Sequence, residues 1–487
     1  MKNLSTLAFF LAAQILAAQS GIVWQPPTTV APASFGNAHP RIALDAAGNP
    51  MVLWGKEGSN KAYFSRWNGV AFSTPVAVNT AQIPVFTASW AGPDLASHGD
   101  TVYVTYKQSP EIAQNPIYLI RSFDGGATFS APVQVEAITD SISRFTTITT
   151  DDAGNPIVAF MKFDPDFSNA RYVVARSQDF GASFSTDVRA SGFSGGTVCD
   201  CCPAAVVSSG QTVAMLYRDN LNNIRDIWAG ISQDGGQTFP AGFAVDESNW
   251  FIQACPSSGA DGFILGDSLY AVFMSQPGGS PRCYFSRASL SDLKAGEIVP
   301  ITGGLSGISL QNYPRIANAG KVAAIVMKQS ANGANQLPLY FDLDITDAEP
   351  PVFEPVANTN AANADVAMTG KTISVVWEDV SSGTVGFRKG TYSTSPATEL
   401  PEENHQKIYP NPTAQHSVTL VLDEKFASSA AAKTTKVLIF NAIGQQMAEF
   451  HRETGDVEMQ IDMSGLSPGI YSVKVGGFTV GRFVVQR

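Results

Sequence analysis

Residues 122–129 read SFDGGATF, and the pattern returns as SQDFGASF at 177–184 and as SQDGGQTF at 232–239. The three aspartates, Asp124, Asp179 and Asp234, follow one another at a constant interval of 55 residues (179 − 124 and 234 − 179). Ser, Asp and Gly together favour a tight turn, because the carboxylate accepts hydrogen bonds from turn amides and glycine tolerates positive φ. We therefore expect these aspartates to stabilise hairpins and to have no catalytic role.

A longer repeat extends over most of the chain. Seven times a glycine precedes a short apolar strand, at intervals of 50 to 56 residues, and the glycine is followed by Asn, Asp, Gln or Lys. These glycines, called marker glycines below, are Gly48, Gly99, Gly154, Gly210, Gly266, Gly320 and Gly370. The apolar strand that follows each of them is called its marker strand. Glycine beside a polar residue is typical of a hairpin turn, and strands rich in Val, Ile, Tyr and Phe are typical of a buried sheet. Each unit then adds two further strands, such as PIYLIRSF and TFSAPVQVE in the unit that contains Gly99.

Four antiparallel strands per unit, with almost no helical pattern, indicate an all-β chain. We predict a seven-bladed β-propeller over residues 21–393, with six blades as the alternative. The last unit ends near residues 384–393 and is one strand short. The stretch IVWQPPTTVA at 22–31 resembles the outer strands FSTPVAV and FSAPVQV, so we expect it to complete the seventh blade and close the ring.

Composition and the N-terminus constrain the compartment and the partners. The 487 residues carry a net charge of −11, which argues against nucleic acid as a partner, because phosphate binding requires clustered Lys and Arg. Residues 1–20 predict a cleaved signal peptide, with one Lys, a short apolar run and small residues before Ser20. No later segment is long and apolar enough to span a bilayer, and we expect an exported monomer without a cofactor.

The motif S-x-D-x-G-x-[TS]-[FW], repeated at this spacing, resembles the Asp-box or BNR repeat of the sialidase superfamily. The resemblance covers residues 21–393 and implies, for an enzyme, an exo-glycosidase that holds an acidic sugar with three arginines and attacks it with a Tyr activated by Glu. The family's first arginine lies in an R-I-P motif, whereas HPRIALD gives Arg41 and Ile42 followed by Ala43. Arg315, in NYPRIAN, is the equivalent residue of unit 6. Sialidases have six blades, so seven units favour a sialidase-like relative.

The residues beyond the propeller resemble a second family. Residues 394–407 form a polar linker, and residues 408–487 show short alternating strands that predict a small β-sandwich. The set YPNP, IFNAIGQ and LSPGIYSVKV resembles the C-terminal sorting domain of type IX secretion cargo. The resemblance implies the type IX secretion machinery as a partner and a location at the outer-membrane surface or outside the cell.

The residue eight places after each marker glycine is expected at the ligand mouth of a propeller. Five of the seven are cations, which would favour an anionic ligand, although rim ion pairs with nearby acids are the alternative. They are Lys56, Lys107, Lys162, Arg218 and Lys328. Together with Arg41, Arg315 and Trp90 they are our predicted ligand-binding residues, and His39 could also stack on a sugar. Catalytic candidates are Tyr313, Asp219 and Glu378, beside Asp164 and Asp379.

The five cysteines map to units 4 and 5 at the same mouth. They are Cys199, Cys201 and Cys202 in GGTVCDCCPAA, Cys255 in QACPSS and Cys283 in SPRCYF. For an exported chain we expect two disulfides and one spare thiol. A thiolate site for Cu(I) or Zn is the alternative, but C-x-C-C has no standard zinc spacing, and we predict no metal.

Two functions follow from these patterns. The first is a secreted or surface-displayed sialidase-like propeller that binds acidic glycans and could hydrolyse them. The second is a non-catalytic surface module for binding or adhesion.

Overall fold

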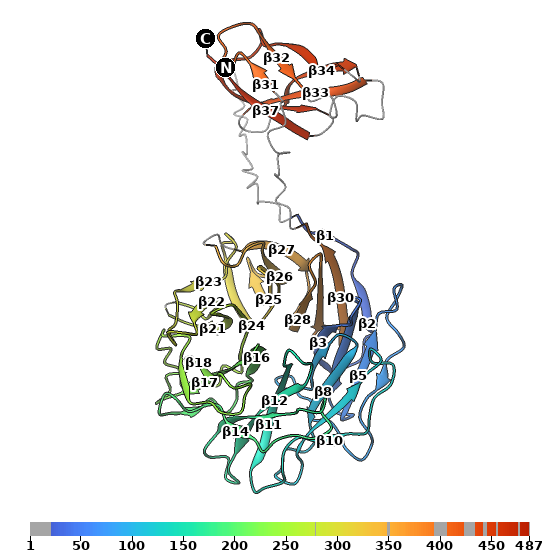
Figure 1. Ribbon diagram of the computed structural model, residues 1–487, viewed down its shortest axis with the longest axis vertical. Helices are drawn as coiled ribbons and strands as arrows, with labels where there is room; N and C mark the ends of the chain where they lie inside the picture. Colours follow the sequence, from blue (N-terminus) through green and yellow to red (C-terminus); the bar gives the residue numbers. More distant parts are fainter. Residues whose placement is uncertain are drawn as a thin grey trace, which may run out of the picture. The chain divides into compact units, whose positions relative to one another are not determined.

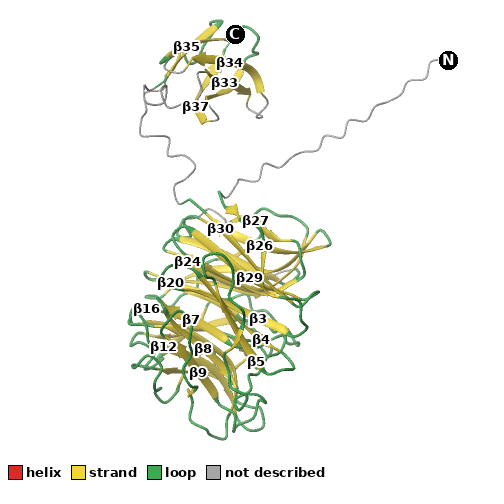
Figure 2. Cartoon of the chain, turned by 90° about the vertical axis from the view of Figure 1, so that its right-hand side faces the viewer, coloured by secondary structure: helices red, strands yellow, loops and turns green. Residues whose placement is uncertain are grey.

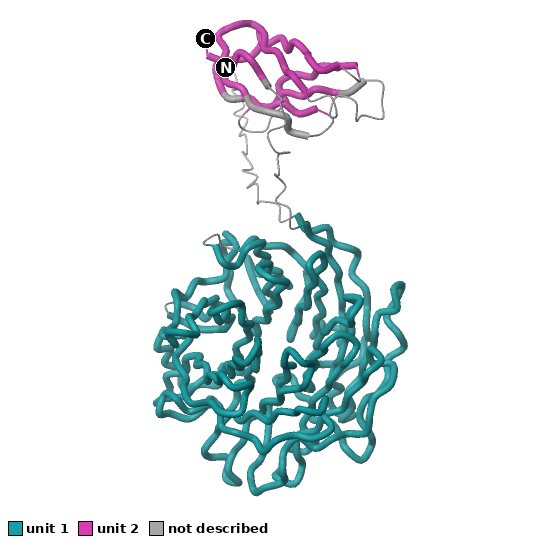
Figure 3. Tube along the Cα trace, in the orientation of Figure 1, with its two compact units in different colours: residues 1–394 teal, residues 395–487 magenta. Residues whose placement is uncertain are grey.

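The structure is a computed structural model, and it describes residues 21–277, 279–347, 351–393, 407–422, 434–441, 446–453, 456–475 and 478–486. The chain divides into two compact units, residues 1–394 and 395–487, each of which is described by itself (Figure 3). The predicted signal peptide and nearly all of the predicted linker lie outside the described residues. The described parts of both units consist of strands and loops, which confirms the all-β prediction (Figure 2). Among them, no helix is long and apolar enough to cross a membrane.

The described strands of the first unit form seven antiparallel sheets, five with four strands and two with five. Sheet 1 contains β3 (Asn37–Leu44), β4 (Pro50–Lys56), β5 (Lys61–Arg66) and β6 (Val76–Ala77). Sheet 2 contains β7 (Asp94–His98), β8 (Thr101–Lys107), β9 (Ile117–Ser122) and β10 (Val133–Gln134). Sheet 3 contains β11 (Ile142–Thr150), β12 (Pro156–Phe163), β13 (Arg171–Arg176) and β14 (Val188–Arg189). Sheet 4 contains β15 (Thr197–Val198), β16 (Ala205–Ser209), β17 (Thr212–Asn220), β18 (Ile227–Ser232) and β19 (Ala241–Ala244).

The remaining three sheets follow in chain order. Sheet 5 contains β20 (Ala260–Leu265), β21 (Ser268–Ser275), β22 (Arg282–Ser289) and β23 (Ile298–Pro300). Sheet 6 contains β24 (Ile308–Ala319), β25 (Val322–Ala331), β26 (Ala334–Asp342) and β27 (Val352–Ala357). Sheet 7 contains β28 (Ala361–Met368), β29 (Thr372–Asp379) and β30 (Thr384–Thr391), joined by β1 (Val23–Trp24) and β2 (Thr28–Ala31).

The first strands of the seven sheets form a closed ring. Each innermost strand contacts the next around the ring, in the order β3, β7, β11, β16, β20, β24, β28 and back to β3 (Figure 1). In sheet 4 the innermost strand is β16. This is the arrangement of a β-propeller. The N-terminal residues take part in the closure as the sequence predicts, because β1 and β2 both pair with β30. Sheet 7 therefore joins the two ends of the propeller sequence.

Apolar side chains fill the spaces between neighbouring sheets. The second strand of each sheet is buried on both faces, as in β8, where Val102, Tyr103 and Val104 have no exposed surface. Burial on both faces explains why the marker strands read as continuous apolar runs and do not alternate. The apolar clusters join neighbours such as sheets 4 and 5, so the ring has no single central core.

The turns that carry Asp124, Asp179 and Asp234, called Asp boxes below, lie at the end of the sheets where the third strands finish. The Asp179 carboxylate accepts hydrogen bonds from Ser177 Oγ (2.7 Å), Ser183 N (2.9 Å) and Ser183 Oγ (2.6 Å). Asp124 and Asp234 accept the same set from the corresponding residues of their turns. The hydrogen bonds from Ser183 and Ser177 lower the pKa of Asp179 to about 2.

We expect Asp179→Ala to lower the free energy of unfolding of the propeller by about 1–3 kcal/mol, because three hydrogen bonds to an ionised acceptor are lost. Ligand binding should not change, since the turn lies away from the ring centre. Chemical denaturation measures the first effect, with Asp140→Ala, at an exposed loop position, as the control. Unchanged stability together with lost ligand binding would instead assign chemistry to the Asp box.

The second unit contains two sheets around one apolar core. One sheet comprises β31 (Lys407–Tyr409), β32 (Ser417–Val421) and β35 (Glu458–Asp462). The other comprises β33 (Thr434–Asn441), β34 (Gln446–Glu453), β36 (Gly469–Val475) and β37 (Phe478–Val485). Leu420 and Ile461 of the first sheet and Ile439 and Phe483 of the second belong to the same buried cluster.

Candidate functional site

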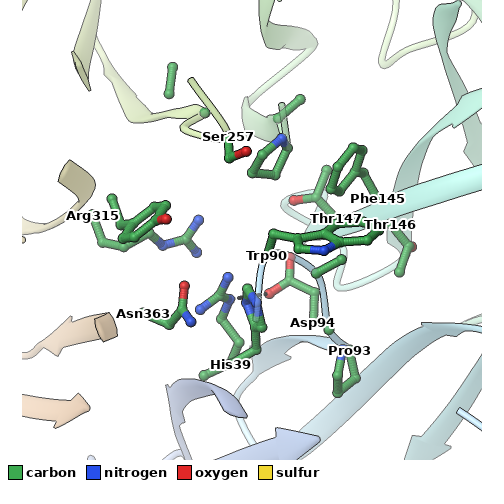
Figure 4. Close-up of a pocket in the computed structure, with 18 of the residues that line it drawn as sticks. His39, Trp90, Pro93, Asp94, Phe145, Thr146, Thr147, Ser257, Arg315 and Asn363 are labelled. Atoms are coloured by element: carbon green, nitrogen blue, oxygen red, sulfur yellow. Dashed lines mark ion pairs between the residues drawn. The ribbon is translucent and has the colours of Figure 1, made fainter. Parts of the chain in front are cut away.

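A pocket lies on the axis of the ring, at the end where the innermost strands begin (Figure 4). It encloses about 700 Å³, counting space that is open to solvent. Side chains from the first strands of several sheets, and from the segments just before them, line it. They include His39, Arg41, Trp90, Asp94, Phe145, Thr146, Thr147, Pro203, Ser257, Tyr313, Arg315 and Asn363. The Asp boxes lie at the opposite end of the sheets, because they follow third strands that run away from the pocket end.

Five lining residues have an unusual backbone conformation. Their φ angles are positive, at 51° for His39, 50° for Phe145, 50° for Ser257, 53° for Tyr313 and 47° for Asn363. In four of the five sheets involved, the ladder between first and second strands has a register shift at this point. A bulge of this kind redirects a side chain, and positive φ in residues other than glycine is costly and gathers at functional sites. The repeated bulge therefore turns one side chain per sheet toward the axis.

Two arginines and three aspartates form a charged cluster, called the floor below: Arg41, Arg315 and Asp94 line the pocket, and Asp261 and Asp365 pair with Arg315 without lining it. Arg41 Nε lies 3.3 Å from Asp94 Oδ1, and Arg315 Nε lies 3.2 Å from Asp365 Oδ1 and 3.4 Å from Asp261 Oδ2. All five side chains are at least three-quarters buried. The floor thus combines the two predicted arginines with acids that the sequence did not single out.

The same aspartates tie neighbouring sheets together. Asp94 Oδ2 accepts the backbone N–H of Ile148 in sheet 3 (3.2 Å), and Asp261 Oδ2 accepts that of Ile316 in sheet 6 (2.9 Å). Asp365 Oδ2 accepts the N–H of Ile42 (3.0 Å), which joins sheet 7 to sheet 1. Each carboxylate therefore links two sheets and also orients an arginine or lies beside one.

The charges around the two arginines shift their pKa values in opposite directions. Burial and then the charge of Arg315 lower the pKa of Arg41. Burial acts to lower the pKa of Arg315 as well, but Asp261 and Asp365 outweigh it and the net shift is upward. Arg41 Nε is buried and faces Asp94 Oδ1 at 3.3 Å, and the Arg315 guanidinium points toward the centre of the pocket (Figure 4). An anionic ligand would relieve the repulsion between the two guanidinium groups.

Aromatic groups form one wall. Trp90 and Phe145 pack edge to face with 5.6 Å between ring centres, and the Arg144 guanidinium lies 5.3 Å from the centre of the Trp90 ring. His39 is buried, and burial followed by the charge of Arg41 lowers its pKa to about 3. His39 is therefore neutral at ordinary pH. A wall of this kind can stack against a sugar ring.

The three catalytic candidates differ in position. Tyr313 lines the pocket, and burial followed by the charge of Glu378 raises its pKa. Glu378 lies behind the lining, where its carboxylate accepts from Asn363 Nδ2 (3.0 Å) and from the backbone N–H of His39 (3.3 Å), and burial raises its pKa. Asp219 is in β17, away from the lining residues, and burial raises its pKa to about 6. Only Tyr313 of these three is placed to touch a ligand.

The other two acids that the sequence singled out have local partners outside the pocket. Asp164 pairs with Arg171 at 2.9 Å, and Asp379 accepts from Thr359 Oγ1 at 2.7 Å.

The five cations that stand eight places after a marker glycine lie at the pocket end of the second strands. None of them is among the residues that line the pocket. Lys56, Lys162 and Lys328 are paired in register with Asn37, Ser143 and Asn312 of the first strands, one strand further from the axis. A residue of the second strand is too far out in the sheet to reach the axial pocket. The arginines of the first strands occupy that place.

Protein groups engage most of these cations. Lys162 pairs with Asp187 (2.5 Å) and Glu136 (3.5 Å), which fits the alternative of ion pairs with acids. Lys107 is buried, donates to two backbone carbonyls and to Ser143 Oγ, and has its pKa lowered by burial to about 8. Lys56 donates to Ser34 Oγ (2.5 Å), whereas Arg218 is buried and donates only to backbone carbonyls.

The cysteines gather beside the pocket wall formed by Pro203. The structure has a disulfide between Cys201 and Cys255, whose sequence separation is 54 residues. Cys199, Cys202 and Cys283 are free and buried. Of the two disulfides that the sequence predicts, the described residues thus contain one, and the Sγ atoms of Cys199 and Cys202 remain unbonded at 2.9 Å.

We expect Gly92→Ala to distort the pocket, because a Cβ at this position would lie 2.5 Å from Cβ of His39. Overpacking of this kind should cost about 1–3 kcal/mol of stability and weaken ligand binding by moving His39. Thermal unfolding and a binding titration measure the two effects. Gly370→Ala is the matched control, since its Cβ would meet nothing within 4 Å. Wild-type behaviour of Gly92→Ala in both measurements would contradict the close packing at His39.

Several lining residues were missed from the sequence. Asp94, Phe145, Ser257 and Asn363 belong to segments that differ in sequence from one unit to the next. The usable signal is the pair of first strands, β3 and β24, in which His39 and Tyr313 are both followed by Pro and Arg.

Comparisons with known proteins give one family and a fold. Residues 407–484 match the family model of the secretion system C-terminal sorting domain, and no curated protein matches the chain. A solved polysaccharide lyase of family PL25, an ulvan lyase bound to -[GlcA(1-4)Rha3S]-, is 9% identical, with a TM-score of 0.50, covering 74% of this chain and 94% of that chain. At this identity the likeness concerns the fold alone.

Two further solved structures are similar. The α-L-arabinofuranosidase Arb93A from Fusarium graminearum is 12% identical, with a TM-score of 0.44, covering 67% of this chain and 98% of that chain. A mutant of Trypanosoma rangeli sialidase displaying trans-sialidase activity is 9% identical, with a TM-score of 0.43, covering 97% of this chain and 93% of that chain.

Proposed function

Because residues 407–484 are a secretion-system sorting domain, which directs a chain by type IX export to the cell surface or the extracellular space, we propose that the first unit binds acidic glycans there. Its seven sheets would be the blades of a seven-bladed propeller. The ligand site would be the axial pocket.

The observation that carries this proposal is the convergence of side chains from five sheets, four of which have a bulged first strand, on a pocket lined by two arginines. Strained backbone repeated around an axis is retained where side chains must be aimed at a ligand. The guanidinium groups of Arg41 and Arg315 suit a carboxylate or sulfate, since a guanidinium binds such groups through two parallel hydrogen bonds. Trp90 and Phe145 offer an apolar face for the sugar ring.

The solved ulvan lyase supports the choice of an acidic glycan. This lyase, one of the solved proteins whose fold this chain resembles, is bound to a glycan that contains GlcA. The geometry favours binding over hydrolysis, because a glycosidase needs an acid and a nucleophile or base on either side of the bond. Tyr313 is the candidate that lines the pocket, and burial raises the pKa of its hydroxyl above the usual value.

A binding and turnover assay with Tyr313→Phe tests the proposal. The purified full chain is titrated with a panel of anionic glycans and incubated with fluorogenic sialosides. We expect binding in the micromolar range or tighter for at least one acidic glycan. If Tyr313 is catalytic, Tyr313→Phe abolishes turnover and retains binding; wild-type binding without turnover identifies the non-catalytic module. Failure of every acidic glycan to bind would contradict the proposal.

A further inference from the structure

Four of the five cysteines gather around one disulfide. The Cys201–Cys255 disulfide joins the segment between β15 and β16 to the segment between β19 and β20. The Sγ atom of Cys199, a free thiol, lies 3.5 Å from Sγ of Cys201 and 2.9 Å from Sγ of Cys202, which is also free. A reduced pair of sulfurs therefore touches an oxidised pair.

The position of Cys199 suits a nucleophile. Thiol–disulfide exchange begins when a thiolate attacks one sulfur of a disulfide, and the 3.5 Å between Cys199 Sγ and Cys201 Sγ is a distance from which positioned reactants react. Nη1 of Arg225 lies 3.0 Å from the Cys199 sulfur and 4.0 Å from that of Cys201, so a cation stands beside the attacking atom. The hydrogen bond from Cys202 and two nearby guanidinium groups lower the pKa of Cys199 to about 6, although burial opposes them.

We propose that these four cysteines form a thiol–disulfide exchange site. In the first step the Cys199 thiolate attacks Sγ of Cys201, the Cys201–Cys255 bond breaks, and the Cys255 sulfur leaves as a thiolate that takes up a proton. In the second step Cys202 gives up its proton and attacks Sγ of Cys199, which forms a Cys199–Cys202 disulfide and releases Cys201 as a thiol. One disulfide and two thiols are present before and after, so no external oxidant or reductant takes part.

The order of the two steps follows from the surroundings of the two thiols. Burial and then the hydrogen bond to Cys199 raise the pKa of Cys202, so Cys199 is the thiol that ionises first. Once Cys199 has bonded to Cys201, its sulfur no longer carries the charge that opposes ionisation of Cys202. The separation of 2.9 Å between the Sγ atoms of Cys199 and Cys202 is only about 1 Å longer than a disulfide bond, so a small movement closes the second disulfide.

The exchange changes what the surface presents. Cys255 is exposed, whereas the three thiols that are free in this structure are buried. Exchange therefore gives the chain an accessible thiol at Cys255. It also removes a covalent link from the wall of the axial pocket, because Cys201 and Cys255 each stand two residues before a lining residue, Pro203 and Ser257. The inference does not depend on the proposed function, because it concerns the sulfurs and not the glycan.

Alkylation of the native full chain without reductant tests the proposal. The chain is incubated with iodoacetamide at mildly alkaline pH, quenched with acid, and mapped by mass spectrometry of its unreduced peptides. We expect the label on Cys255 and Cys201, and a disulfide between Cys199 and Cys202. The reagent traps the released thiols, so the label accumulates even where the original disulfide is the more stable one. Cys283 is buried and should stay unlabelled, which reports that the chain remains folded.

Two variants separate the steps. Cys199→Ser removes the attacking sulfur, so Cys255 should stay unlabelled and the Cys201–Cys255 disulfide should persist. Cys202→Ser should stop the exchange after the first step, with a label on Cys255 and a disulfide between Cys199 and Cys201.

Two further variants test the role of the cation and the specificity of the label. Arg225→Gln should slow the labelling of Cys255 about tenfold, because the Cys199 thiolate becomes less populated. Cys283→Ser is the matched control, and its Cys255 should be labelled at the wild-type rate.

The contrary results are distinct. An unlabelled Cys255 in the wild-type chain, when the same reagent labels it after chemical reduction, would overturn the exchange. Equal labelling of Cys255 in Cys199→Ser and in the wild type would overturn the choice of nucleophile. A label that reaches Cys255 only together with Cys283 would come from unfolding and would also overturn the proposal. The map of the wild-type chain decides the outcome even if a variant fails to fold.

Discussion

Replacing Arg315 by Lys is expected to weaken the binding of acidic glycans by about 10- to 100-fold, which corresponds to the loss of one charge-assisted pair of hydrogen bonds. Lysine keeps a positive charge near Asp261 and Asp365, so these two carboxylates retain a counter-charge. It lacks the planar fork of donors, so it cannot hold a carboxylate or sulfate through two parallel bonds. Isothermal titration with the tightest-binding glycan measures the change.

Arg121→Lys is the matched control, because Arg121 donates to the backbone carbonyls of Asp179 and Phe180 at the Asp-box end of the sheets. It should leave glycan affinity unchanged. Equal affinities of the wild type and Arg315→Lys would show that the floor of the pocket does not contact the ligand.

Asp365→Ala is expected to lower the free energy of unfolding of the propeller by about 3–5 kcal/mol. The change removes an acid from the buried pair with Arg315 and removes the acceptor of the Ile42 N–H, which joins the last sheet to the first. Both losses act at the junction where the ring closes. Chemical denaturation followed by tryptophan fluorescence measures the effect.

Asp164→Ala is the comparison for this prediction. Asp164 also pairs with an arginine, at 2.9 Å, but 40% of its side chain is exposed. An exposed ion pair contributes about 0–1 kcal/mol, so this variant should be nearly as stable as the wild type. Similar losses in the two variants would show that Asp365 does not close the ring.

The sequence predicted the fold better than the site, for a physical reason. Marker glycines and buried second strands recur in every unit because hairpins and packing between sheets impose the same demand each time. The Asp boxes illustrate this demand, since Asp124, Asp179 and Asp234 repeat the same hydrogen bonds. Closure by residues 22–31 could be predicted because an incomplete last sheet needs a partner strand.

The site depends on residues that differ between units, so periodicity reveals its position but not its chemistry. Arg41, Arg315, Trp90 and Tyr313 could be selected because they lie in first strands or just before one. The lysines of the second strands share the same end of the sheets, but only the three-dimensional arrangement shows that they lie one strand away from the axis. The bulges that aim Phe145 and the other lining residues have no sequence signature in a single chain.

The most direct test of the glycan pocket compares one ligand with and without its charge. The tightest-binding acidic glycan is titrated into the full chain by calorimetry, and the titration is repeated after its carboxyl groups have been reduced to alcohols. If Arg41 and Arg315 hold the acidic group, the reduced glycan should bind at least about tenfold more weakly. Equal affinity for the charged and the reduced glycan would contradict a pocket built to bind an anion.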